Sequence, residues 1–333
     1  MTTTINSAST TATGWYATGN TVELSTSTNT SSLTSAQIGK LSTEQVANLT
    51  AQQVADIAVS SFAGFSASQI RSLGSAQMVA LTTLQIRALS NTQLGAMNSA
   101  QVNALDSSQI RALTTTQISI LRQDQIKGVS SSVIGSLSIN QISALSTHQI
   151  RALDTEQIIG LVEGQIAYLS NSQVTSLSGA QVAAMETRDL ANLNSAQLQA
   201  LSTGQIVQLT SAQMAALQPT QVAALSTAQF QVLKTNQISA MSTAQYGSVT
   251  STQLRVLSSR QIGAMDTQDI AVLSTAQVAS LATAQIVGLT TQQLVAMSSQ
   301  QVAAMTGTQL QSLSVKQVAG IRAETCRGLQ LHS

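Results

Sequence analysis

Very few residues of this chain have side chains suited to catalysis or metal binding. Its 333 residues include two histidines, His148 and His332, and one cysteine, Cys326. The histidines lie far apart in sequence, and no carboxylate pair, nucleophile with a neighbouring base or metal-ligand spacing accompanies them. A single cysteine also excludes a disulfide within the chain and a cysteine-based metal cluster. We therefore expect no enzymatic activity, no cofactor and no metal site.

One polar residue recurs at a fixed spacing, a glutamine in almost every repeat of an octapeptide. The repeat runs without insertion or deletion from Leu33 to Leu329, which gives 37 copies. With Leu33 as position 1, positions 1 and 6 are apolar, position 5 is Gln in 32 copies, and position 2 is Ser, Thr, Asp or Asn in 28. A short, unbroken period predicts one elongated repeat body rather than the two globular domains that the length alone would suggest.

Positions 2 and 5 of the octad predict the start of a helix. Ser, Thr, Asp and Asn cap helix N-termini through a side-chain oxygen, and a Gln three residues later completes a capping box. The only proline, Pro219, falls at position 3, the first helical position, where its missing N–H does least harm. Acidic residues concentrate at positions 2–5 and basic residues at positions 7–8, as the helix dipole favours.

We therefore predict an all-α solenoid with one very short capped helix per octad, over roughly positions 3–8, and a tight reversal through positions 1 and 2. One continuous helix is excluded, because an eight-residue period turns its apolar stripe around the helix axis. The alternative is a β-solenoid with one strand per octad, against which Ala and Gln count as poor strand formers. Helices this short need stacked neighbours, and either two or three helices per superhelical turn fits the sequence.

The chain divides into a non-repeat segment over 1–32, the repeats over 33–329 and a tail over 330–333. Trp15 and Tyr16 lie in the first segment, which we interpret as an arm or cap, or as an assembly element that docks these rings onto another subunit. The last octad brings charge to the end of the repeats, as a solenoid cap requires. Cys326 occupies position 6 of that octad, as a small core residue or as an intermolecular bridge.

Charge and hydropathy limit the partners and the location. Only 8% of the residues are charged and the formal net charge is +1, so we expect no nucleic-acid binding. Scattered arginines at position 7 indicate a solvated face, with an anion or polysaccharide site as the alternative. No apolar run reaches the roughly 20 residues of a membrane helix. The first residues lack a cleavable signal peptide, so an extracellular or cell-surface location requires export by another route.

Two resemblances accompany these patterns. Residues 217–225 resemble the opening of the first helix in the DNA-reading repeats of TAL effectors, but the second helix and base-reading loop are missing, so DNA reading is not carried over. Over residues 33–329, the tandem Ser/Thr-x-x-Gln-Ile/Val-x-x-Leu pattern resembles repeat regions of secreted and cell-surface, adhesin-like bacterial proteins. This second resemblance implies a bacterial surface location more than an activity.

Three functions remain open from the sequence. The first is a structural protein, a subunit of a self-assembling extracellular filament or surface stalk that joins end to end with copies of itself. The second is an adhesin or an ice- or glycan-binding module that uses ladders of Thr, Ser and Gln. The third is a secreted spacer or length-setting protein. The position-5 glutamines are expected to hold helix starts together, and not to bind a ligand.

Overall fold

One short helix per octad is also what the computed structural model shows for residues 29–162 and 164–321, the part of the chain that it describes. Helix α14 (Thr147–Ala152) is typical. The side chain of Ser146 accepts a hydrogen bond from the Gln149 N–H, and the Gln149 side chain accepts one from the Ser146 N–H. The helix ends at Leu153, which is extended with φ −60° and ψ 140°. Two extended residues, Leu153 and Asp154 at positions 1 and 2, therefore connect α14 to the next helix.

The elements fall into two compact units, which are divided after Leu169. The first unit contains α1 (Ser35–Ile38), α2 (Thr43–Ala47), α3 (Ala51–Asp56), η1 (Val59–Gly64), α4 (Ala67–Ser72), α5 (Ser75–Ala80), α6 (Thr83–Ala88), α7 (Asn91–Ala96), α8 (Ser99–Asn103), α9 (Ser107–Ala112), α10 (Thr115–Ile120), α11 (Gln123–Lys127), α12 (Ser131–Gly135), α13 (Ile139–Ala144), α14, α15 (Thr155–Ile159) and η2 (Ile166–Tyr168).

The second unit begins at Ser170 and follows the same plan. It contains α16 (Asn171–Ser176), α17 (Gly179–Ala184), α18 (Thr187–Asn192), α19 (Ser195–Ala200), α20 (Thr203–Ile206), α21 (Ser211–Ala216), α22 (Pro219–Ala224), α23 (Thr227–Gln231), α24 (Thr235–Ile238), α25 (Thr243–Ser248), α26 (Ser251–Arg255), α27 (Ser259–Ile262), α28 (Thr267–Ala271), α29 (Thr275–Ser280), α30 (Thr283–Val287), α31 (Thr291–Val295), α32 (Ser299–Ala303) and α33 (Gly307–Gln311).

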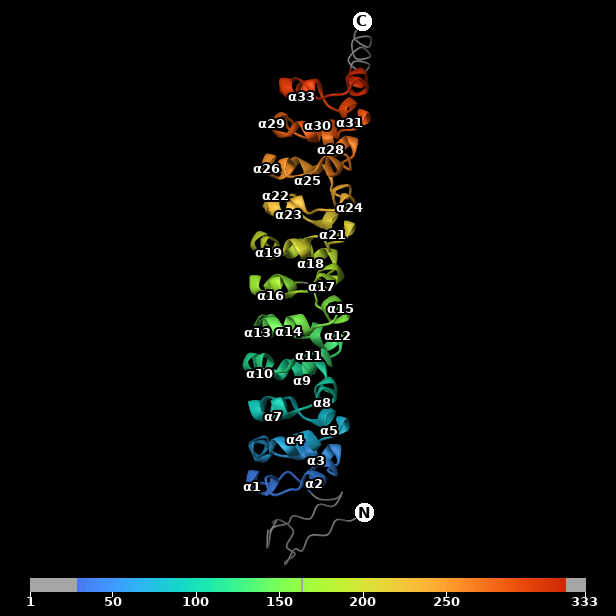
Figure 1. Ribbon diagram of the computed structural model, residues 1–333. Helices are drawn as coiled ribbons and strands as arrows, with labels where there is room; N and C mark the ends of the chain where they lie inside the picture. The colour runs from blue at the N-terminus through green and yellow to red at the C-terminus, as the bar shows by residue number, and fades with distance from the viewer. Residues whose placement is uncertain (1–28, 163, 322–333) are drawn as a thin grey trace, which may run out of the picture. The chain divides into compact units, whose positions relative to one another are not determined.

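Helices three octads apart pack against one another, so each superhelical turn contains three helices. In the first unit α4, α7, α10 and α13 form one stack, and in the second α16, α19 and α22 do (Figure 1). Within each unit the other helices stack with the same period of three. The structure therefore decides the number of helices per turn, which the sequence left open.

The interior of each unit is built from positions 1 and 6. In the octad that begins at Leu89, Leu89 is 3% exposed and Leu94 is fully buried, and the same two positions are buried in nearly every other described octad. Burying a Leu or Ile side chain stabilises the fold by about 1.5–3 kcal/mol. Because each helix is too short to persist alone, this shared core is what holds the helices in their conformation.

The predicted fold class is confirmed, and the β-solenoid alternative is not supported. The described ranges contain helices and no strand. Pro219 takes the first helical position of α22, as predicted. Two octads depart from the α-helix: η1 and η2 are 3-10 helices, and the second follows Gly164, whose φ is +89°. The predicted boundaries after residues 32 and 329 stay predictions.

Small residues at positions 7 and 8 bring neighbouring turns into close contact. Gly160 at the end of α15 lies so near α12 that a Cβ on it would sit 2.7 Å from both the carbonyl oxygen and the Cβ of Ser131. Gly135 in α12 faces the carbonyl oxygen of Gly160 in turn. In the second unit Gly263 and Gly288 repeat this arrangement. Glycine is required here by the approach of one backbone to another, not by its φ angle.

Replacing Gly160 with alanine should destabilise the first unit. The new Cβ would overlap Ser131, and forcing atoms into a packed contact costs about 1–3 kcal/mol. Gly95 is the matched control, because a Cβ on it would meet nothing within 4 Å. In a helix, Gly95→Ala should add about 0.5–1 kcal/mol of stability. Urea unfolding of both variants measures the difference, and equal midpoints would show that the close contact is not needed.

Candidate functional site

The most developed polar site in the described part of the chain is the contact that position-5 glutamines make with the preceding turn of the same unit. Gln149 is 2% exposed. Its Oε1 accepts a hydrogen bond from the Ser146 N–H at 2.7 Å, while its Nε2 donates to the carbonyl oxygens of Ile118 at 2.8 Å and Leu121 at 2.7 Å. One amide therefore caps its own helix and also binds the main chain of the turn before it.

The same register recurs in both units. In the first, Gln85 donates to the carbonyls of Val54 at 3.1 Å and Ile57 at 2.7 Å. In the second, Gln301 donates to those of Ile270 at 2.8 Å and Leu273 at 2.6 Å. In most of these contacts the two acceptors occupy positions 6 and 1. Gln117, Gln165 and Gln261 donate to positions 7 and 1 instead. In both cases the amide binds the junction between two helices of the preceding turn.

This contact meets a need that short helices create. The last carbonyls of a helix have no partner inside it, and in a helix of six residues they are a large share of all its carbonyls. Leaving a buried polar group unsatisfied costs about 1–3 kcal/mol. A primary amide suits the position, because it has one acceptor for the cap N–H and two N–H donors for the two carbonyls.

The described residues that replace Gln at position 5 differ in the polar atoms that they bring to this contact. Ser61 in η1 reaches one of the two carbonyls, since its Oγ donates to the Leu33 oxygen at 2.6 Å. Val133 in α12 has no polar atom, and the side chain of Ser130 makes no cap hydrogen bond there. Asp189 in α18 is buried, and the Glu186 side chain at its cap position pairs with Arg188 at 2.6 Å.

Asp269 in α28 is the most informative exception, because a second residue compensates for it. Its Oδ2 accepts from the Asp266 N–H at 3.0 Å, which preserves the capping half of the contact. The carbonyl of Ile238, which the regular register assigns to position 5, instead accepts the hydroxyl of Tyr246 at 2.6 Å. Tyr246 lies at position 6 of α25, on which α28 packs, and it is fully buried.

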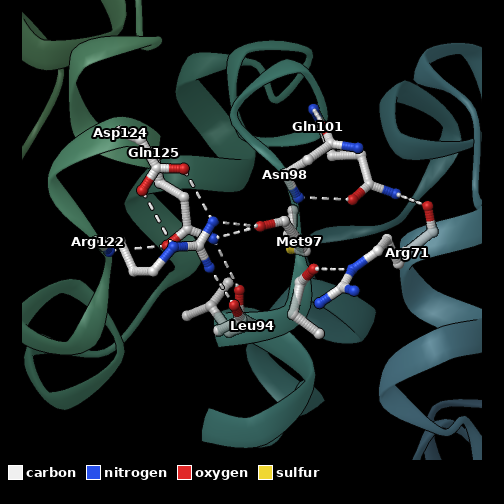
Figure 2. Close-up of polar contacts among 10 residues, drawn as sticks. Arg71, Leu94, Met97, Asn98, Gln101, Arg122, Asp124 and Gln125 are labelled. Carbon is white, nitrogen blue, oxygen red and sulfur yellow. Dashed lines mark hydrogen bonds and ion pairs between the residues drawn. The ribbon is translucent and has the colours of Figure 1, made fainter.

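Arginine replaces the cap residue at position 2 in one octad and forms a surface cluster there. Arg122 donates to the carbonyls of Gly95 and Met97 and pairs with Asp124 at 2.9 Å. Figure 2 shows Arg71 approaching the same segment from the other side, where its Nε donates to the Ala96 carbonyl at 3.2 Å.

The hydrogen bond from Arg122 lowers the pKa of Asp124 below the usual carboxyl value. The side chains of Arg122 and Asp124 are 45% and 59% exposed. The pair is therefore a surface interaction that contributes little to stability. The guanidinium instead adds donors to carbonyls of the preceding turn, next to the Gln125 amide, which donates to the carbonyls of Leu94 and Met97.

The residues singled out from the sequence are distributed as follows. Trp15, Tyr16 and Cys326 lie outside the described residues, so their role in assembly stays a prediction. His148 is exposed on α14, in agreement with a solvated residue. The position-7 cations of described octads are exposed in the last turns of their helices: Arg71, Arg87, Arg111, Lys127, Arg151 and Arg255.

The capping half of the glutamine contact is predictable from the sequence, whereas the half that joins turns is not. The capping partner is three residues away, inside one octad. The carbonyl acceptors are 28 and 31 residues away, and a strictly repeated sequence gives no sign of which octads meet. The positions that could indicate which octads meet are those where the repeat is irregular. Gly135 and Gly160 lie 25 residues apart, as do Gly263 and Gly288.

Within the described ranges, no group of three or more His, Cys, Asp and Glu side chains is arranged to hold a metal ion. None of the described helices combines the length and the apolar character that crossing a bilayer needs. What the observed contacts do chemically is to satisfy main-chain groups and bind successive turns to one another.

A family model described as "ALTTAQ repeat" matches eight segments of the chain. They cover residues 60–91, 83–115, 94–131, 182–219, 214–251, 248–283, 262–299 and 278–315. Together these segments span more than half of the chain and stay inside the octapeptide region. No curated protein matches the sequence.

Removing one buried amide should weaken the first unit measurably. Gln149→Met keeps the approximate size of the side chain but leaves the Ser146 N–H and the carbonyls of Ile118 and Leu121 without this partner. We expect the free energy of unfolding to fall by about 2–5 kcal/mol, from the cost of unsatisfied buried groups. Urea unfolding followed by far-ultraviolet circular dichroism measures it.

Gln292→Met is the matched control, because Gln292 lies at exposed position 4 of α31. Its effect should stay within about 0.5 kcal/mol, as for most surface substitutions. Similar losses in the two variants would mean that the interior amide has no special role.

Proposed function

The chain belongs to the ALTTAQ repeat family, and on this premise we propose that it is a non-enzymatic structural protein, a subunit of a self-assembling extracellular filament or surface stalk. The observation that carries the proposal is the amide contact that recurs between turns within each unit. Gln85 and Gln301, in different units, bind the preceding turn through the same two positions. A body held by one repeated contact gains length with each added turn and needs no new interaction.

The composition of the surface supports a structural role. The formal net charge of +1 and the charged fraction of 8% mean that copies of the chain repel one another only weakly. Exposed positions carry mostly Ser, Thr, Ala and Asn, which allow close approach without a large desolvation cost. These features favour self-association over binding of a charged partner such as nucleic acid.

The adhesin, ice-binding and glycan-binding alternatives receive less support. A flat array of threonine hydroxyls needs strands, and in the described residues the position-2 threonines cap helices. Thr82 and Thr114, for example, accept hydrogen bonds from the N–H groups of Gln85 and Gln117. Because these hydroxyls already serve the fold, they are poorly placed to bind an external surface.

A spacer or length-setting function remains compatible with the same geometry and differs from the filament proposal in one respect. A spacer acts as a single molecule, whereas a filament subunit joins other copies. In a filament, the contacts between copies would come from elements outside the repeats. Trp15 and Tyr16 are the candidates that the sequence indicates for these contacts.

Electron microscopy of the purified protein over a range of concentrations tests the proposal. We expect filaments that become more abundant as the concentration rises, and we expect Trp15→Ala/Tyr16→Ala to form fewer of them. The helical circular dichroism spectrum of that variant should be unchanged, which separates loss of assembly from loss of folding. Dispersed monomers at every concentration and in several buffers would contradict the filament function.

A deletion series, followed by electron microscopy, tests the spacer function through the number of turns in the protein. Deleting residues 89–112 removes three whole octads, so the chain should stay folded and lose one turn. Deleting residues 93–96 is the matched control, because half an octad breaks the register of the amide contacts and should disrupt the helices around it. A three-octad deletion that unfolds the protein would show that turns are not interchangeable.

A further inference from the structure

In the stack of α25 on α28, in the second unit, two ionisable residues take over the regular glutamine contact. In the regular register, a position-5 side chain at residue 269 would face the carbonyls of Ile238 and Met241, as Gln237 faces those of Ile206 and Leu209. Asp269 stands there instead, and it is 1% exposed. Tyr246 supplies the donor to Ile238 that a glutamine would have supplied.

We propose that Tyr246 and Asp269 form a proton-dependent lock on the contact between α25 and α28. With a neutral Asp269 the contact carries no buried charge, and the Tyr246 hydroxyl satisfies the carbonyl of the preceding turn. With an ionised Asp269 a negative charge lies at a position that the register directs toward carbonyl oxygens, the negative ends of peptide dipoles. The contact therefore weakens when the proton leaves.

The surroundings of Asp269 offer little to offset that charge. Among the described residues, only the Asp266 N–H donates a hydrogen bond to its carboxylate. The carboxyl of Asp266 itself lies nearby and caps α28 by accepting from the Gln268 and Asp269 N–H groups. The helices that pack on α28 are α25 and α31, and α22 packs on the far side of α25. Together these three helices contain Tyr246 as their one titratable group and no cation. A carboxylate without a positive partner in a buried site is costly.

The titration of the two groups fits this arrangement. The pKa of Asp269 is raised from 3.8 to about 6, mainly by burial. The hydrogen bond from the Asp266 N–H opposes this rise, and the negative charge of Asp266 adds to it. Burial also raises the pKa of Tyr246 well above 10, with Asp269 and Asp266 adding to the shift. Tyr246 therefore keeps its proton, and Asp269 is the group that switches.

The direction of the pH effect follows from where the proton binds. The folded protein holds the Asp269 proton more tightly than an opened or unfolded chain does, so its contribution is complete below pH 3.8. The contribution is lost as the pH rises through about 6. The contact between α25 and α28 should therefore be most stable in acid, and it should open more readily at neutral pH.

Hydrogen exchange of the full-length protein between pH 4 and 7.5 tests the lock. Asp269→Asn has nearly the same shape and cannot ionise. Comparing it with the unchanged protein at each pH cancels the intrinsic pH dependence of exchange. In α25 and α28 the two should exchange alike at pH 4, and at pH 7.5 the unchanged protein should exchange faster, by up to about 100-fold, since each pKa unit corresponds to a factor of ten.

Two controls keep the test decisive. Glu44→Gln removes an exposed carboxylate in the first unit and should leave exchange in α25 and α28 unchanged at every pH. If Asp269→Asn fails to fold, a carbon-13 titration of the unchanged protein replaces it. A carboxyl that titrates near pH 6, displaced from the range of the exposed acids, supports the lock. The lock is overturned if every carboxyl titrates near pH 4, or if the unchanged protein and Asp269→Asn differ equally at all pH values.

Discussion

The amide of the position-5 glutamine is the interaction on which the rest of the structure depends. Each helix has only a few internal hydrogen bonds, and its ends would be left with unsatisfied main-chain groups. The Gln149 side chain supplies hydrogen bonds at both kinds of helix end, because it caps the start of its own helix and binds two carbonyls of the preceding turn. The apolar residues at positions 1 and 6 then supply the core that keeps these polar contacts away from water.

The local structure could be predicted from the sequence, whereas the arrangement of the turns could not. Helix starts are encoded within four residues, and Pro219 and the cap residues at position 2 lie where the sequence places them. Stacking depends on contacts 25 to 31 residues apart. In a chain whose octads are nearly alike, every whole-octad register satisfies the same apolar pattern, so the three-helix turn had to come from the structure.

The candidate site divides in the same way. The sequence predicts a structural role for Gln at position 5, but it does not predict the hydrogen bonds that Gln donates to the preceding turn. The exchange of a glutamine for Asp269, with the Tyr246 hydroxyl in its place, involves two residues in different octads. Each looks like an isolated substitution in the sequence. Only their positions in space show that one compensates for the other.

The glycine pairs have a consequence for how the chain finds its register. Gly135 faces Gly160 so closely that a larger residue would not fit. If the stack slipped by one octad during folding, Ala152 or Tyr168 would arrive opposite Gly135 instead. These glycine pairs therefore allow an octad to stack on its native partner and disfavour stacking on the octads next to that partner. In a chain of near-identical repeats, these few irregular positions discourage frame-shifted stacking and exchange of turns between molecules.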